Sequence, residues 1–304
     1  MKNYFPLRIC AGLMLLLLVN CSDDTGNAVA GGEEGRFAPG GQVLSSFNAR
    51  YPLATGVVWS VEGGYYVADF VLESQAASAW FGESGEWTLG RIPAPYGEQV
   101  EPVVSEALSH TAYANWEVRG AYVLNRKQLT PVYSVNVTNS RIYSNLYFTQ
   151  YGDFIKVIDD VNSHTDAPVI IPSALMNAID RLFTDIEIVD VSLIDVINSE
   201  VSVGILKNES YLTSIFSKSY AWIVNFWNLT PQTVPQKVWD SFRSSEYAGL
   251  TLSRIRSMEN ATATTYLFYV IRNNKTMIIE FNSDGRMTTI ISRQHVMAKY
   301  LLTI

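Results

Sequence analysis

The feature that most constrains the fold is a short unit that recurs along the chain, and its clearest copy runs from Gln42 to Leu89. It starts with apolar residues at helical spacing and reaches Tyr51-Pro52. A strand centred on Trp59, a Gly63-Gly64 turn, a return strand and two further short strands follow. This order predicts a helix and then a four-stranded antiparallel meander.

A second copy begins near Glu98. At first its residues follow those of the first copy by 57 positions, which aligns Trp116 with Trp59 and Val104 with Phe47. The hairpin loop at 125–130 is longer than its counterpart, and beyond it the spacing is 67. An insertion at a hairpin tip with the spacing kept on either side indicates a duplicated unit. The pairs at spacing 67 are Tyr66 with Tyr133, Trp80-Phe81 with Tyr147-Phe148, and Gly85 with Gly152.

Two more copies complete the chain. The third begins at Pro172-Ser173 with the clearest amphipathic helix pattern, but it lacks the glycine turn, so its membership depends on order and length. The fourth has a helix at 235–246, and Tyr266, Phe281 and Gly285 each lie 133 positions after a residue of the second copy. The fold class predicted is α+β, with tandem helix-plus-four-stranded antiparallel meander units in two domains. We expect domain 1 at 42–160, a linker at 161–171 and domain 2 at 172–304.

The first 20 residues are typical of a targeting segment. Lys2 and Arg8 precede an apolar run from Ile9 to Val19 that is too short for an ordinary membrane-spanning helix. Leu18-Val19-Asn20-Cys21 resembles a bacterial lipobox, which makes Cys21 the lipid attachment site and 1–20 a lipoprotein signal peptide. The alternative is a plain secretory signal cleaved nearby. Residues 21–41, rich in Gly, Ser and acids, predict a flexible tether.

Charge and cysteine content exclude several functions. Without residues 1–20 the chain keeps 20 basic and 29 acidic residues and no basic run, which disfavours nucleic-acid binding. Cys10 leaves with the signal and Cys21 carries lipid. The folded part therefore has no thiol for a disulfide, a nucleophile or a thiolate metal site.

The pattern resembles PepSY-like domains. The resemblance is carried by Phe47-x-x-x-Tyr51-Pro52, by Val58-Trp59-x-Val61 with Tyr66-Val67-x-x-Phe70, and by the strand-turn-strand Ile279 to Met287. Such exported, often lipid-anchored domains of Bacteroidetes type are similar in fold to the beta-lactamase inhibitor protein (BLIP), in which two helix-plus-meander halves share one sheet. The resemblance implies two PepSY-like, BLIP-like domains, with binding or inhibition in the periplasm as the activity and without a known partner.

Candidate chemistry is sparse. His110, His164 and His295 lie far apart, and Gly82-Glu83-Ser84-Gly85 is too short for a nucleophile elbow. The acids between Asp180 and Asp195 are expected to be solvated. We therefore predict no catalytic, cofactor or metal residue and no enzyme. Asn282-Ser283-Asp284-Gly285 predicts a hairpin turn, and weak calcium binding stays an open alternative there because PepSY-like proteins have been linked with calcium.

Aromatic residues in excess of core needs are the candidate binding surface. Tyr65 must face away from its neighbour Tyr66, Tyr122 and Tyr143 flank loops, and Trp222 and Trp227 are expected on opposite faces of one strand. A solvent-exposed sheet face lined with Tyr and Trp would dock a protein or a glycan. Alternatively, the other domain covers this face.

The function predicted is that of a non-enzymatic envelope lipoprotein that binds a protein partner through an exposed aromatic sheet face. A surface glycan- or matrix-binding lipoprotein is the alternative, and a hydrolase ranks last. The expected location is the cell envelope, lipid-anchored at the periplasmic face of the outer membrane or at the cell surface.

Overall fold

The computed structural model describes residues 38–94, 102–160, 166–195, 200–273 and 275–291. The predicted signal peptide, the lipid site Cys21, nearly all of the predicted tether, His164 and His295 lie outside these residues. Within them, no helix is long and apolar enough to span a bilayer.

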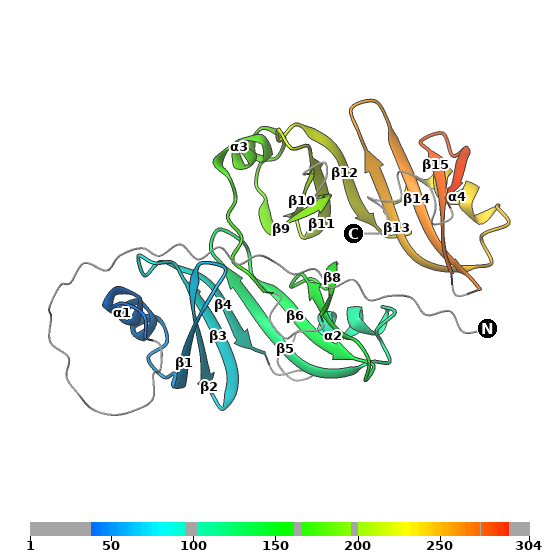
Figure 1. The fold of residues 1–304 in the computed structure, drawn as a ribbon. Helices are drawn as coiled ribbons and strands as arrows, with labels where there is room; N and C mark the ends of the chain where they lie inside the picture. Colours follow the sequence, from blue (N-terminus) through cyan, green and yellow to red (C-terminus); the bar gives the residue numbers. More distant parts are fainter. Residues whose placement is uncertain (1–37, 95–101, 161–165, 196–199, 274, 292–304) are drawn as a thin grey trace, which may run out of the picture. The chain divides into compact units, whose positions relative to one another are not determined.

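Two eight-stranded antiparallel sheets hold the described strands in strict chain order, so every strand pairs with its neighbours in sequence (Figure 1). Sheet A contains β1 to β8 and sheet B contains β9 to β16. The strands of sheet A are β1 (Thr55–Glu62), β2 (Tyr65–Leu72), β3 (Gln75–Phe81), β4 (Trp87–Pro93), β5 (Glu117–Arg126), β6 (Val132–Thr138), β7 (Tyr143–Phe148) and β8 (Phe154–Asp160). Those of sheet B are β9 (Glu187–Asp195), β10 (Glu200–Lys207), β11 (Ser210–Phe216), β12 (Trp222–Leu229), β13 (Thr251–Glu259), β14 (Thr264–Arg272), β15 (Lys275–Asn282) and β16 (Met287–Ile291).

One short helix precedes each group of four strands. The helices are α1 (Gly41–Arg50), α2 (Pro102–Ser109), α3 (Ser173–Leu182) and α4 (Gln236–Arg243). Each buries two apolar residues one turn apart, for example Val43 and Phe47 in α1, because positions i and i+4 share one helix face. The predicted α+β class with four helix-plus-meander units is confirmed. Since β4 pairs with β5 and β12 with β13, two units share each sheet.

Three glycines explain why the last turn of a unit fits against its helix. Gly85, Gly152 and Gly285 have φ of +80°, +85° and +75°. A Cβ at any of them would lie 2.9 Å from a carbonyl oxygen in the first turn of α1, α2 or α4. Each position therefore requires glycine for two reasons, which are its left-handed backbone and the close approach of the helix. The predicted Asn282–Gly285 hairpin turn is one of these three.

The third unit has the same turn without the glycine. Tyr220 occupies the position with φ of +61°, and its amide donates to the Ser217 carbonyl (2.9 Å) as that of Gly85 does to Gly82 (2.9 Å). The closing bond from the Ser217 amide to the Ala221 carbonyl is also present (2.8 Å). This shared geometry supports the membership of the third unit independently of order and length.

Strand register confirms part of the predicted repeat and corrects the rest. Tyr66 pairs with Phe81, and both Tyr133 with Phe148 and Tyr266 with Phe281 repeat this pair, as the spacings of 67 and 133 predict. The equivalence of Trp59 and Trp116 is wrong. Tyr66 pairs with Val61, and Trp59 lies two residues before Val61. Tyr133 pairs with Val123, and the residue two before Val123 is Ala121.

Additional residues between α2 and β5 explain this error, because Trp116 lies before the strand, in a turn that ends with its amide bonded to the Tyr113 carbonyl (2.9 Å). The pairing of Phe47 with Val104 is wrong for a related reason. The carbonyls that face Gly85 and Gly152 belong to Gln42 and Val103, which aligns Phe47 with Leu108.

Each sheet has a helix face, which packs on its two helices, and an opposite face. On the helix face of sheet A, Phe47 of α1 contacts the rings of Trp59, Phe70 and Phe81, with centroids 5.2 to 6.1 Å apart. These edge-to-face contacts fill the core of the first unit. The opposite face is made by the alternate residues of the same strands and carries the candidate site.

Candidate binding surface on sheet A

Three of the five predicted surface aromatics lie on the opposite face of sheet A. Tyr65 packs beside the buried Val67, Trp80 and Leu89, whereas its neighbour Tyr66 joins the helix-face core. Tyr122 lies on β5, and Tyr143 begins β7 with 51% of its surface exposed. Tyr65 and Tyr122 are half-buried. Alternation along three different strands therefore brings these tyrosines to one face.

Arg91 organises the centre of this face. Its guanidinium carbon lies 3.4 Å from the ring centroid of Tyr122, and Nη2 donates to Oδ1 of Asn136 (2.9 Å). Asn136 in turn donates to Asn145 on the next strand. On the other side of Arg91, Ser78 donates to Asp69 (2.6 Å). A row of polar side chains thus crosses the sheet with its rotamers fixed by stacking and hydrogen bonds.

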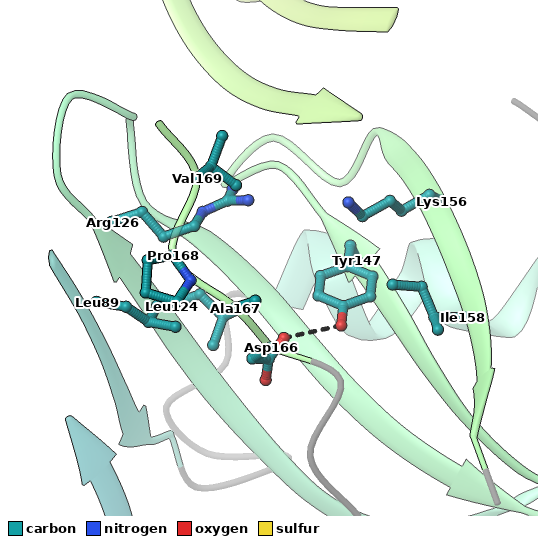
Figure 2. Close-up of a pocket in the computed structure, with 10 residues that line it drawn as sticks. All are labelled: Leu89, Leu124, Arg126, Tyr147, Lys156, Ile158, Asp166, Ala167, Pro168 and Val169. Carbon is teal, nitrogen blue, oxygen red and sulfur yellow. Dashed lines mark hydrogen bonds between the residues drawn. The ribbon is translucent and has the colours of Figure 1, made fainter. Parts of the chain in front are cut away.

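A small cavity opens beside this row (Figure 2). Its walls are apolar side chains of sheet A, two cations and the segment 166–169, and its volume is about 190 Å³. Asp166 holds the segment in place: it accepts from the Tyr147 hydroxyl (2.8 Å), and Arg91 Nε lies 3.3 Å from its Oδ2 in an ion pair. The lining residues are Leu89, Leu124, Arg126, Tyr147, Lys156, Ile158, Asp166, Ala167, Pro168 and Val169.

The two cations of the cavity share one buried carboxylate. Arg126 Nη1 lies 3.0 Å and Lys156 Nζ 2.9 Å from Oδ1 of Asp190 on β9, and Figure 2 shows the nitrogen ends of both side chains directed toward each other. Ser192 donates to the same carboxylate (2.7 Å). Burial alone would raise the pKa of Asp190, but Lys156, Arg126 and Ser192 outweigh it and hold the pKa below its usual value.

The two predicted tryptophans lie elsewhere, and the expectation that they face opposite ways is wrong. Trp222 and Trp227 both pack against the core under α3, opposite Phe216 and Leu212 of β11. A register shift next to Phe216 inserts one extra residue in β12, which returns Trp222 to the face of Trp227. Their indole nitrogens donate to Asn225 (2.9 Å) and Glu259 (3.0 Å).

Sequence reasoning missed the charged centre of the site. The prediction that the acids between Asp180 and Asp195 are solvated is wrong for Asp190, which is 5% exposed and bonded to two cations. The sequence does not identify Arg126 and Lys156 as site residues, because no spacing along the chain indicates that β5, β8 and β9 lie close together. His110 is exposed and its Nε2 lies 4.0 Å from Glu106. Among the described residues, no group of His, Cys, Asp or Glu is arranged to hold a metal ion.

Three solved structures from Bacteroides species are similar to part of the chain. A DUF2874 family protein from Bacteroides ovatus is 28% identical, with 40% of this chain and 89% of that chain covered and a TM-score of 0.38. A BLIP-like protein from Bacteroides fragilis is 25% identical, with 45% of this chain and 97% of that chain covered and a TM-score of 0.40. A structure described as "putative periplasmic proteins" from Bacteroides eggerthii is 22% identical, with 42% of this chain and 94% of that chain covered and a TM-score of 0.40.

No curated protein matches the sequence. The family model described as "Putative beta-lactamase-inhibitor-like, PepSY-like" matches residues 64–156, which run from the start of β2 to Lys156 in β8 and include the strand residues of the cavity. This match confirms the resemblance that the strand and turn motifs indicate. Residues 64–156, which form most of sheet A, are therefore similar to the PepSY-like, beta-lactamase-inhibitor-like family.

Proposed function

We propose that the chain is a non-catalytic binding module of the cell envelope and that it docks a protein partner on the opposite face of sheet A. The observation that carries the proposal is Arg91, which stacks on the Tyr122 ring and donates a hydrogen bond to Asn136 beside the cavity. Side chains whose rotamers are already fixed lose little entropy when a partner binds. Arg and Tyr are also the residue types that dominate binding energy at protein interfaces.

The exposed edge of this face adds apolar contact area. Tyr143 is 51% and its neighbour Ile142 46% exposed at the turn between β6 and β7. On β1, Val58 is 56% exposed. A specific interface needs on the order of 800 Å² from each partner. Tyr143 and Val58 lie near the two ends of the sheet, on β7 and β1. Side chains of β5 to β8 pack against sheet B, so a partner would use the part of the face that this contact leaves open.

Glycan binding is the alternative, and it uses exposed aromatic rings as stacking platforms. Trp222 and Trp227 are packed under α3, and one side of the Tyr122 ring is covered by Arg91. Tyr143 alone among the five candidates has more than a third of its surface exposed. The contacts of these residues therefore favour a protein partner.

A site-specific crosslink tests the proposal. Tyr143 is replaced in the full chain by a photoreactive phenylalanine analogue, and irradiation in the native envelope should give one dominant crosslinked protein. Leu53, which is 75% exposed just after α1, provides the control position. The yield of this crosslinked protein should fall when the Tyr143 replacement is combined with Arg91→Gln. A product that forms equally from both positions, or that ignores Arg91→Gln, would contradict docking on this face.

We further propose that Cys21 anchors the module to a membrane by its lipid, which would keep the partner search within the envelope. Several acyl chains on one residue hold a protein firmly to a bilayer. Incorporation of labelled palmitate should be complete in the native chain and absent in Cys21→Ser. Labelling that survives this substitution would place the lipid elsewhere, and no labelling of the native chain would favour the plain secretory signal.

A further inference from the structure

The cavity beside Arg91 carries more positive than negative charge. Arg126 and Lys156 have side chains 5% and 22% exposed, and in the described part of the chain both form their ion pairs with Asp190. Arg91 and Asp166 form a second, balanced pair (3.3 Å). Among the described residues three cations therefore face two carboxylates, on a chain whose formal net charge is −7. Largely buried charges are normally paired, so the excess cation calls for an anion from outside.

The hydrogen bonds of Arg126 do not use its Nε atom. Its Nη1 donates to Asp190 and its Nη2 to the Val189 carbonyl, while its buried Nε has no hydrogen-bond partner among the described residues. Asp190 already accepts from Arg126, Lys156 and Ser192. The carboxylate of Asp190 is thus fully used, and the unpaired Nε belongs to a residue that lines the cavity.

The remaining walls and the volume limit what can enter. Leu89, Leu124 and Ile158 provide an apolar side, as do Pro168 and Val169. About 190 Å³ is below the roughly 300 Å³ at which pockets for complete small ligands begin, and it suits one side chain. A dianionic phosphate would exceed the single excess charge. An Asp or Glu side chain would leave much of the apolar wall without contact.

We propose that this cavity binds a carboxylate carried on a short apolar group, and that its source is the C-terminal residue of a partner polypeptide. An aliphatic C-terminal residue supplies the anion for Arg126 and the hydrocarbon for Leu89, Leu124 and Ile158 at the same time. The inference rests on the proposed protein-binding function and names the group of the partner that the site recognises. The carboxylate would gain charge-assisted hydrogen bonds in a mostly buried setting.

Two matched probes test the charge requirement on the full chain. N-acetyl-leucine has the carboxylate and the apolar side chain, and N-acetyl-leucinamide differs only in lacking the charge. In an NMR titration followed on the Leu and Ile methyl groups, the acid should bind saturably with shifts at Leu89, Leu124 and Ile158. The amide should bind about tenfold or more weakly, as loss of a charge-assisted bond implies. Equal binding of the two probes, or binding of neither, would overturn the proposal.

A charge variant with a matched control locates the effect. Lys156→Gln removes the excess cation and leaves the pair of Arg126 with Asp190, so the chain should fold. Lys127→Gln removes the same charge next to Arg126, from a side chain 46% exposed that pairs with Glu86 outside the cavity. The preference for acid over amide should vanish in Lys156→Gln and persist in Lys127→Gln. A preference unchanged in both variants, or lost in both, would contradict the site.

The two possible sources of the carboxylate need a third probe, 4-methylpentanoate, which has the same acid and hydrocarbon without a peptide bond. If the source is a chain end, N-acetyl-leucine should bind more tightly than this free acid. Equal or tighter binding of 4-methylpentanoate would assign the cavity to small aliphatic acids and overturn the chain-end assignment. A Tyr143 crosslink that persists while all probes fail would refute the cavity inference and leave the proposed function intact.

Discussion

Sheets A and B are built on one plan, yet their opposite faces differ. On sheet A, the bonded pairs Ser78–Asp69 and Arg91–Asn136 lie in one row across neighbouring strands, beside a cavity. On sheet B, the corresponding strands carry a buried apolar cluster that includes Ile215, Phe226 and Leu267. Within that cluster's face lies Arg256, 1% exposed, with no carboxylate paired to it in the described chain.

The helix faces show why this divergence is tolerated. A left-handed turn residue recurs at the same place in every unit, as Gly85, Gly152, Tyr220 or Gly285. In the three glycine units, a Cβ on the glycine would lie 2.9 Å from a helix carbonyl oxygen. A close-packed contact restricts both its partners, so few substitutions survive there. The opposite faces carry no contact that is repeated in this way, and the chemistry of the two sheets differs there.

The largest expected effect is the loss of Asp190, which joins the opposite face of sheet A to β9 of sheet B. Asp190→Ala leaves Arg126 and Lys156 without a counterion and should lower the free energy of unfolding by about 3–5 kcal/mol. Asp284→Ala removes an exposed acid 3.7 Å from Lys237 and should change it by less than about 0.5 kcal/mol. Urea denaturation measures both, and similar values for the two variants would contradict the structural role of Asp190.

Asp190 also predicts a pH dependence. Its folded-state pKa is lowered, because its two cations and Ser192 outweigh burial, so its contribution is present above the unfolded-state pKa. The contribution is lost as the pH falls through the folded-state pKa. Native stability should therefore decline on acidification, and the Asp190→Asn variant should show a flatter decline.

The second comparison concerns the buried arginines, which should respond in opposite directions. Arg126→Met removes the donor to the Val189 carbonyl and one partner of Asp190, and should destabilise the fold by about 1–3 kcal/mol. Arg256 has unpaired Nε and Nη1 atoms, and burial lowers its pKa. Arg256→Met should therefore stabilise by about 1–2 kcal/mol. Destabilisation by both substitutions would show that the two faces are not distinct in this respect.

Much of the fold could be predicted from the sequence because the repeated residues are those that the turn and the helix face require. Gly85, Gly152 and Gly285 identify their units because no other residue fits the backbone and the helix together. The third unit lacks this glycine pattern, because Tyr220 adopts a left-handed φ at the same place in the turn. Spacing alone failed where loop lengths differ, and so Trp116 was matched to Trp59 although Ala121 holds the position.

The site was only partly predictable. Alternation places Tyr65, Tyr122 and Tyr143 on one face, since the side-chain period of a strand is two. That rule fails wherever a register shift adds a residue, which is why Trp222 returns to the helix face. The cluster of Arg126, Lys156 and Asp190 depends on the packing of β5 and β8 against β9. Long-range contacts of this kind leave no local pattern in the chain.

The third comparison is between the turn residues. Gly85→Ala places a side chain at φ of +80° and a Cβ 2.9 Å from the Gln42 carbonyl, which should cost about 1–3 kcal/mol. Gly152→Ala and Gly285→Ala should cost similar amounts. Tyr220→Gly relieves the left-handed strain and loses packing against the α3 core, so its net effect should stay within about 1 kcal/mol. Thermal unfolding of the four variants measures this, and a harmless Gly85→Ala would refute the close approach.

The smallest expected effect distinguishes two acids that each link sheet A to sheet B, Asp153 and Asp190. Burial raises the pKa of Asp153, although hydrogen bonds from Asn228 (3.3 Å) and Thr149 (3.0 Å) oppose it, whereas the pKa of Asp190 is lowered. A raised carboxyl pKa means that ionisation disfavours the fold, so the penalty is present above the folded-state pKa and vanishes below the unfolded-state value. Asp153→Asn keeps a neutral group that can accept from Asn228 and donate to Thr149. Asp153→Asn should stabilise the chain at pH 7 by less than about 1 kcal/mol. Asp190→Asn should destabilise it, because that change removes the partner of two cations. The described hydrogen bonds of Asp153 come from neutral groups. Urea denaturation of both variants at pH 7 and pH 4 measures the signs, and a loss of stability in Asp153→Asn at pH 7 would mean that its hydrogen bonds outweigh the cost of its buried charge.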